Sequence, residues 1–216
     1  MTVSTMLSLL SEGFVTSLLI FALTLLFSMP LGLAVMFGRR SRLTPLRGFI
    51  KAYISIMRGT PLMLQLMVVF YGPKLLLGVT VPGNWRFTAV IVAFVINYAA
   101  YFAEIYRGGI ESIPRGQYEA AQVLGYTKAQ TFFKIILPQM VKRVIPAVTN
   151  EVITLVKDTS LARTIAIIEI TMAGEAFMKS KGITWPLFYT GVFYLAFVGL
   201  LTLLFSFIER KLSYFK

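Results

Sequence analysis

The sequence predicts an all-α transmembrane protein with five membrane-spanning helices. Of its 216 residues, 57% are hydrophobic and only 14% are charged, and the mean hydropathy is +0.77. A soluble domain has about half apolar and about a quarter charged residues, so this composition indicates a membrane protein. A hydrocarbon core about 30 Å thick needs roughly 20 apolar residues of helix, and several stretches approach that length. We expect residues 1–216 to form a single transmembrane domain.

The candidate spans differ in how far charged residues interrupt them. The first and the last are uncharged. The second contains Arg58 and Lys74, the third contains Glu104 near its end, and the fourth contains Glu151. In chain order, the five predicted spans cover residues 14–37, 53–77, 87–106, 139–158 and 184–208.

The distribution of lysine and arginine predicts the orientation of the chain. The loops after the first and third spans, together with the C-terminal tail, hold fourteen basic residues, whereas the alternate loops hold five. Basic residues in short loops are retained in the cytoplasm, so we expect the N-terminus outside and the C-terminus inside. The net charge of +12 does not indicate nucleic-acid binding, because these charges bracket apolar spans and form no basic face of a soluble fold.

The residue content also excludes several kinds of site. The chain has no cysteine and no histidine, which removes thiol nucleophiles, Cys/His metal sites and imidazole catalysis. The sequence holds no metal-ligand cluster, no nucleophile with a base and no G-x-x-x-x-G-K-[ST] loop, so we expect neither an enzyme nor a chain that binds ATP itself. A self-sufficient secondary transporter or channel is the alternative interpretation, although the chain shows no internal repeat of the kind common in such transporters.

The loop of residues 108–137 lies on the cytoplasmic side of this topology and is too long for a simple connection. Its composition favours two short helices, Gln117–Leu124 and Lys128–Leu137, on either side of Gly125. Glycine at that point suits a left-handed C-terminal cap. A stiff element between two spans can transmit force from a cytosolic partner, so we predict a docking element here.

The spacing within this loop resembles that of the integral membrane subunits of ABC importers, and among them the polar amino-acid uptake permeases. The signature of that family is EAA, three residues, G, nine residues and I-x-LP. The matching residues here, without any departure in spacing, are Glu119, Ala120, Ala121, Gly125, Ile135, Leu137 and Pro138. The phrases RGTPLMLQL, AEIYRGGIESIPRGQYEAA and LVKDTSLA also resemble the amino-acid branch, so the likeness runs from about Arg58 to Ala162.

That resemblance implies a five-helix type I permease in a bacterial inner (cell) membrane. It implies that Glu119, Ala120, Ala121 and Gly125 belong to a coupling helix that docks on a separate ATP-binding cassette ATPase. ATP and magnesium would be bound by that ATPase, and no cofactor is expected in this chain. The other implied partners are an extracellular or periplasmic substrate-binding protein and an amino-acid substrate. A homodimer is the simpler expectation for the paired permeases, with a heterodimer as the alternative.

Polar residues inside the predicted spans recur in pairs spaced seven residues apart. The pairs are Arg58 and Gln65, Asn97 and Glu104, and Glu151 and Asp158. A spacing of seven puts both members on one helix face, and that face should turn inward because lipid offers polar groups no partner. Arg58 and Glu104 come out at similar depth near the cytoplasmic side, so we predict a structural ion pair between them.

The three polar residues nearest the middle of the bilayer are predicted to bind substrate: Gln65, Asn97 and Glu151. The two amides can donate to an α-carboxylate, and the carboxylate of Glu151 can hold an ammonium or guanidinium group. The substrate is therefore expected to be a cationic or other polar amino acid. The alternative role for Gln65 and Asn97 is interhelical hydrogen bonding, which is common in membranes.

The segment beyond Glu151 should leave the membrane on the outer side. We expect Asp158, Thr159 and Ser160 to lie at the rim and to form part of an outer gate. By resemblance, the amphipathic stretch that follows contains candidate contacts with the binding protein, and its alternative interpretation is a solvated loop. These candidates are Arg163, Glu169, Glu175 and Lys179.

Overall fold

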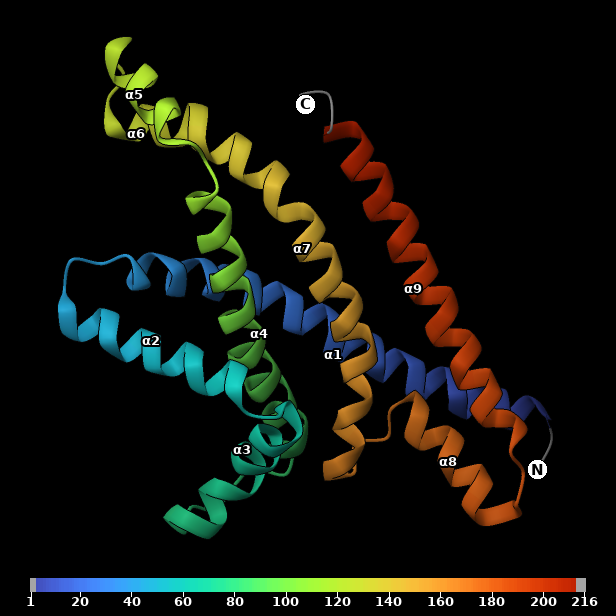
Figure 1. Ribbon diagram of the computed structural model, residues 1–216. Helices are drawn as coiled ribbons and strands as arrows, with labels where there is room; N and C mark the ends of the chain where they lie inside the picture. Colours follow the sequence, from blue (N-terminus) through green and yellow to red (C-terminus); the bar gives the residue numbers. More distant parts are fainter. Residues whose placement is uncertain (1–2, 213–216) are drawn as a thin grey trace.

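The structure is a computed structural model that describes residues 3–212, and nearly all of these residues are helical (Figure 1). Residues 1–2 and 213–216 of the predicted domain lie outside the described residues. In chain order the helices are α1 (Val3–Arg39), α2 (Thr44–Gly59), α3 (Leu62–Leu77), α4 (Trp85–Glu111), α5 (Arg115–Val123), α6 (Lys128–Gln130), α7 (Leu137–Asp158), α8 (Ile170–Lys181) and α9 (Trp185–Leu212). A π-helical turn, Thr131–Ile136, joins α6 to α7, and a 3-10 turn, Thr159–Ile165, follows α7.

The first predicted span is part of a much longer helix. α1 has 37 residues, which corresponds to about 55 Å of helix, and it crosses the central helix α4 (Figure 1). The two backbones come close at Gly32. A Cβ atom at this position would lie 2.8 Å from Cβ of Phe102 and 3.0 Å from the carbonyl oxygen of Ala99. The crossing therefore depends on a residue without a side chain.

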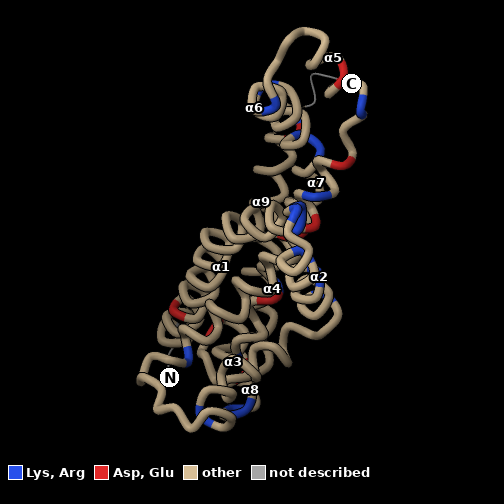
Figure 2. The backbone as a smooth tube through the Cα atoms, turned by 90° about the vertical axis from the view of Figure 1, so that its left-hand side faces the viewer, with Lys and Arg blue, Asp and Glu red and all other residues tan. Residues whose placement is uncertain are grey.

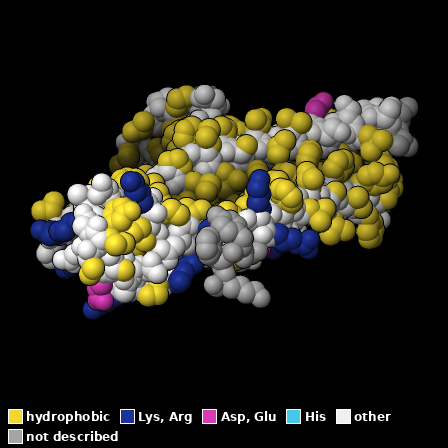
Figure 3. Space-filling view, turned by 90° about the horizontal axis from the view of Figure 1, so that it is seen from above, with side chains coloured by type: hydrophobic (Ala, Val, Ile, Leu, Met, Phe, Trp, Pro, Cys, Tyr) yellow, Lys and Arg dark blue, Asp and Glu magenta, His cyan; other side chains and the backbone are white. Residues whose placement is uncertain are grey.

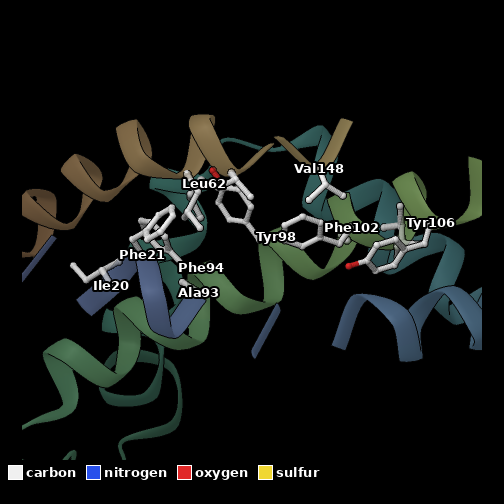
Figure 4. Close-up of a cluster of buried hydrophobic side chains, with 14 of the residues drawn as sticks. Ile20, Phe21, Leu62, Ala93, Phe94, Tyr98, Phe102, Tyr106 and Val148 are labelled. Carbon is white, nitrogen blue, oxygen red and sulfur yellow. The ribbon is translucent and has the colours of Figure 1, made fainter. Parts of the chain in front are cut away.

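Aromatic side chains on α4 form the centre of the packing. Phe94, Tyr98, Phe102 and Tyr106 recur every four residues, which puts them on one helix face, and each is at most 8% exposed. Figure 4 shows these rings along α4, with Val148 of α7 beside them. The rings of Phe102 and Tyr106 stack with their centres 6.1 Å apart. α4 is thus the axis against which the neighbouring helices pack.

The second predicted span, residues 53–77, is not one helix. α2 ends at Gly59, α3 begins at Leu62, and the two are bent by 110°. The physical reason is Pro61, which has no N–H to donate and disfavours helical geometry in the residue before it. Thr60 accordingly has an extended backbone, with φ −125° and ψ 149°. The prediction of one continuous span is corrected to a broken pair of helices.

Three of the described helices are long and apolar enough to cross a membrane, namely α1, α4 and α9. The bent pair of α2 and α3 passes the same test as a fourth, broken span. α7 is not among them, and it carries five charged residues in its 22. The predicted total of five spans is therefore not reached by length and composition alone.

The loop of residues 108–137 projects from one end of the helix bundle (Figure 1). It contains α5, close to the first of the two short helices predicted for it, and Gly125 has the predicted left-handed backbone with φ +76°. The second predicted helix, Lys128–Leu137, is not a separate element, because α6 continues through the π-helical turn into α7. Lysine and arginine are frequent around α5, α6 and α7, whereas long stretches of α1 and α9 are uncharged (Figure 2). The charged loop and the apolar helices therefore occupy different parts of the molecule.

Replacing Gly32 with alanine should lower the thermal stability of the protein in detergent, because the added methyl group overlaps α4. We expect a loss of about 1–3 kcal/mol, the usual cost of overpacking. Gly191→Ala on α9 is the matched control, since nothing lies within 4 Å of its Cβ position. Heating followed by size-exclusion chromatography measures both variants. Equal stability of Gly32→Ala and the parent would contradict this close helix crossing.

Candidate functional site

Two side-chain amides hold the break between α2 and α3. Gln65 donates from Nε2 to the carbonyl oxygen of Met57 at 3.0 Å and to that of Thr60 at 3.1 Å. Asn97 of α4 donates from Nδ2 to the Met57 carbonyl oxygen at 3.1 Å and to Oε1 of Gln65 at 2.9 Å. A helix end leaves carbonyl groups without backbone donors, and these amides supply them. Gln65 and Asn97 thus make the interhelical hydrogen bonds that were the alternative to substrate binding.

A cavity of about 380 Å³ lies beside this break. Its volume falls in the range of roughly 300–1,000 Å³ that is common for small-molecule sites. Gln65 is not among its lining residues, because its side chain is turned toward the break. Pro61 at the break lines the cavity, together with the polar residues Thr60, Asn97, Tyr98, Tyr101, Glu151, Thr154 and Asp158.

The two carboxylates in the cavity wall come from one face of α7. Glu151 and Asp158 are seven residues apart and both line the cavity. Asp158 accepts a hydrogen bond of 2.7 Å from the hydroxyl group of the buried Tyr98. Glu151 is half-buried, and it is the nearer of the two to the middle of α7. A cation that enters this cavity would meet two carboxylates, one of which is already held by a hydroxyl group.

The three predicted gate residues do not lie together at this site. Asp158 lines the cavity, whereas the hydroxyl groups of Thr159 and Ser160 donate to carbonyl oxygens three residues earlier, each at 2.8 Å. Thr159 is 1% exposed. These two hydroxyl groups therefore stabilise the turn after α7, and only Asp158 reaches the cavity.

Glu104 on α4 is the centre of a cluster of three arginines. Its oxygens lie 2.7 Å from Nη2 of Arg107, 3.3 Å from Nε of Arg39 and 3.8 Å from Nη1 of Arg58. The predicted contact between Arg58 and Glu104 is thus the longest of three, and the Arg58 side chain is 46% exposed. The Arg58 guanidinium also lies 5.4 Å from the ring centre of Tyr101, in the cavity wall. The cluster joins α1, α2 and α4, so Glu104 does not depend on one partner.

Two tyrosines of the site, Tyr98 and Tyr101, are not among the predicted residues. Tyr101 lies four residues after Asn97 and three before Glu104, so helical spacing alone places these three on one face of α4. That spacing could have identified Tyr101. The contact of Tyr98 with Asp158 joins two helices whose relative rotation no sequence pattern reveals.

The segment after α7, which is predicted to lie on the outer side, differs in part from the prediction of a contact with the binding protein. Glu169 is fully buried, and its carboxylate accepts hydrogen bonds from the backbone N–H groups of Thr171 and Met172 at 2.8 and 2.7 Å. It is an N-terminal cap for α8 and is not accessible to a partner. Arg163 and Lys179 both pair with Glu175 on α8.

The projecting loop presents apolar side chains to its surroundings. Ala121 packs inward at 1% exposed, whereas Val123 and Leu124 are 87% and 73% exposed. Glu119 and Ala120 are exposed on the same helix. After the turn at Gly125, a capping box between Thr127 and Gln130 fixes the start of α6. The loop is therefore rigid at its turn and apolar at its tip, as a protein-docking element requires.

Three comparisons with known proteins bear on this chain. Residues 28–214 match the family described as the binding-protein-dependent transport system inner membrane component. The arginine transport system permease protein ArtQ of Bacillus subtilis is 35% identical over 203 residues, which cover 94% of this chain and 91% of that protein. The L-cystine transport system permease protein TcyB of Bacillus subtilis is 40% identical over 162 residues, which cover 74% and 67%. A crystal structure of an amino acid ABC transporter with histidines has a TM-score of 0.87 at 29% identity, and covers 98% of this chain and 100% of that one.

Replacing Asn97 with leucine should lower thermal stability, because the Met57 carbonyl and Oε1 of Gln65 would lose a buried donor. We expect a loss of about 1–3 kcal/mol for the unsatisfied groups. Gln65→Leu should have a similar effect, and the double variant should lose less than the sum, since both side chains belong to one network. Asn150→Leu, at an exposed position of α7, is the control. Strictly additive losses in a detergent melting assay would contradict a shared network.

Proposed function

The chain belongs to the family of binding-protein-dependent transport system inner membrane components, among the permease subunits of ABC amino-acid importers, and we propose that it forms the membrane path for a cationic amino acid. In this proposal, a binding protein outside the cell delivers the substrate. A separate ATP-binding cassette ATPase docks on the loop of residues 108–137 and supplies the energy. Two copies of the permease enclose the path.

The observation that carries the coupling role is the exposed apolar tip of α5. Val123 and Leu124 lie in a charged loop outside the apolar helices, where water would surround them unless a protein covered them. Glu119 is exposed one turn earlier on the same helix and can pair with a basic group of a partner. These exposed residues lie within or next to the motif of the family, which supports α5 as the coupling helix.

The polar face of the cavity supports a second permease subunit. Arg58 is exposed beside Tyr101 at the edge of the cavity, and Thr154 and Glu151 are half-buried in its wall, on helices that we place in the membrane. Lipid offers such groups no hydrogen-bond partner, so protein or a water-filled path must cover them. A second copy of this chain about a two-fold axis is the simplest cover. We further propose that α7 is the fifth span, because its residues Glu151 and Asp158 line the cavity, and that the N-terminus lies outside.

The two carboxylates of the cavity support a cationic substrate. Glu151 can pair with an ammonium or guanidinium group, and Asp158 adds a second negative charge to the same cavity. In this proposal Gln65 and Asn97 act indirectly: their hydrogen bonds fix the break between α2 and α3, which forms the opposite wall of the cavity. One relative is named for arginine transport and another for cystine transport, so the charge of the substrate's side chain is tested by experiment below.

Glu119→Lys and Gly125→Val should leave the chain in the membrane and uncouple ATP hydrolysis from uptake. The first variant reverses an exposed charge on α5, and the second places a β-branched residue at φ +76°. Gly83→Val, in an open position far from this loop, is the matched control. Pull-down of the ATPase and its substrate-stimulated turnover are the measurements. Unchanged affinity and turnover in both variants would overturn the coupling role of α5.

Glu151→Gln should weaken the uptake of arginine and lysine by about ten-fold or more, while glutamine uptake changes less. The amide keeps the shape of the side chain but loses a charge-assisted contact worth roughly 1.5–3 kcal/mol. The measurement is uptake of each amino acid into vesicles that contain the permease, the ATPase and the binding protein.

The matched control for this experiment is Glu209→Gln, the same change at a carboxylate of α9 that contacts Thr149 and does not line the cavity. Substrate-stimulated ATP hydrolysis is measured in parallel, because the binding protein imposes a selectivity of its own. If Glu151→Gln transports arginine, lysine and glutamine as the parent does, Glu151 does not read the charge of the substrate.

A further inference from the structure

A second, larger cavity lies between the end of α1 and the projecting loop. Its volume is about 720 Å³, and its walls come from the C-terminal end of α1, the end of α4, α5 and the turn into α6. It is separate from the cavity that contains Glu151. In its wall, the rings of Phe37 and Phe132 lie beside each other, tilted by 59° and with their centres 6.3 Å apart.

The lining of this cavity combines positive charge, hydroxyl groups and apolar surface. Arg40 and Lys128 supply two cations, and none of the ten lining residues is acidic. Tyr118, Tyr126 and Thr127 supply hydroxyl groups, and Lys134 lies 5.9 Å from the ring centre of Tyr126. Phe37, Ile110 and Phe132 supply the apolar part. Such a lining fits a ligand with an anionic, oxygen-rich head and an apolar body.

The cavity also lies at the level where a membrane surface is expected. α1 has no charged residue between Glu12 and Arg39, so Arg39 and Arg40 follow directly after the uncharged stretch that is expected to lie in the membrane. Figure 3 looks onto the end of the molecule that carries α5 and α6, and shows lysine and arginine side chains beside hydrophobic ones. A phospholipid headgroup at this level can reach Arg40 while its acyl chains remain beside α1.

We propose that this cavity binds the headgroup of an anionic phospholipid. The phosphate contacts Arg40 and Lys128, which belong to α1 and to the docking loop, and the start of the acyl chains packs on Phe37 and Phe132. The lipid thereby ties the end of α1 to the loop that docks the ATPase. This coupling consequence rests on the proposed function, whereas the binding itself does not.

Binding is tested on the full chain in detergent by native mass spectrometry, with titration of short-chain phosphatidylglycerol or phosphatidylcholine. We expect the double variant Arg40→Gln/Lys128→Gln to bind phosphatidylglycerol roughly ten- to thirty-fold more weakly than the parent, since each cation near a membrane surface contributes about 1 kcal/mol. The control Arg42→Gln/Arg47→Gln removes the same charge from exposed positions outside the cavity and should bind as the parent does. Equal affinities of the two double variants, or no preference of the parent for phosphatidylglycerol, would overturn the proposal.

Two further experiments identify the source of the phosphate and test the functional consequence of lipid binding. Soluble glycerol 3-phosphate should not displace the bound lipid, and displacement at comparable concentration would identify a site for a free phosphate compound instead. In vesicles with the ATPase and the binding protein, phosphatidylglycerol should raise substrate-stimulated ATP hydrolysis for the parent and the control, but not for Arg40→Gln/Lys128→Gln. A chain that binds the lipid but never stimulates an ATPase would refute the proposed function and leave the lipid site standing.

Discussion

The carbonyl groups at the break between α2 and α3 need donors that neither lipid nor bulk water supplies inside a membrane, and the arrangement of the site depends on this need. Gln65 meets it from within α3, and Asn97 meets it from α4. Because Asn97 must face the break, the rotation of α4 about its own axis is fixed relative to α2. Tyr101 and Glu104 lie on the same face of α4 and therefore face the same way. The 110° bend in turn leaves room for the cavity beside Pro61.

The charge on Glu104 is balanced in a way that a single ion pair could not achieve. A carboxylate removed from water loses several kcal/mol of hydration, and one partner at 3.8 Å recovers only part of it. Arg107 and Arg39 lie closer, and they approach from α4 and α1. Arg58 consequently remains partly exposed and lies over Tyr101 at the edge of the cavity. Arg58 therefore takes part both in the ion cluster around Glu104 and in the wall of the candidate site.

Features that depend on local order along the chain were predictable, and features that depend on helix rotation were not. The three long apolar helices, the short helix before Gly125 and the left-handed backbone of Gly125 all follow from residues close together in sequence. The apolar residues on either side of Pro61 predict one continuous span, whereas the proline itself favours the break that the structure has. The pairing of Tyr98 with Asp158, and of Glu104 with Arg39, joins residues about 60 positions apart and depends on how α4 faces α7 and α1. The hydrogen bonds of Gln65 could not be predicted for the same reason, since their acceptors exist only once the helix is broken.

The helical path from Lys128 to Asp158 is continuous, because the π-helical turn joins α6 to α7 without a gap. These 31 residues span about 46 Å at the usual rise. A tilt of about 5° at the docking end would therefore displace the far end by about 4 Å, more than a hydrogen-bond length. This helical path therefore has the proposed ATPase-docking loop at one end and the carboxylates of Glu151 and Asp158 toward the other. The capping box between Thr127 and Gln130 fixes the direction in which this long helical path begins, and so the position of Asp158 at its far end.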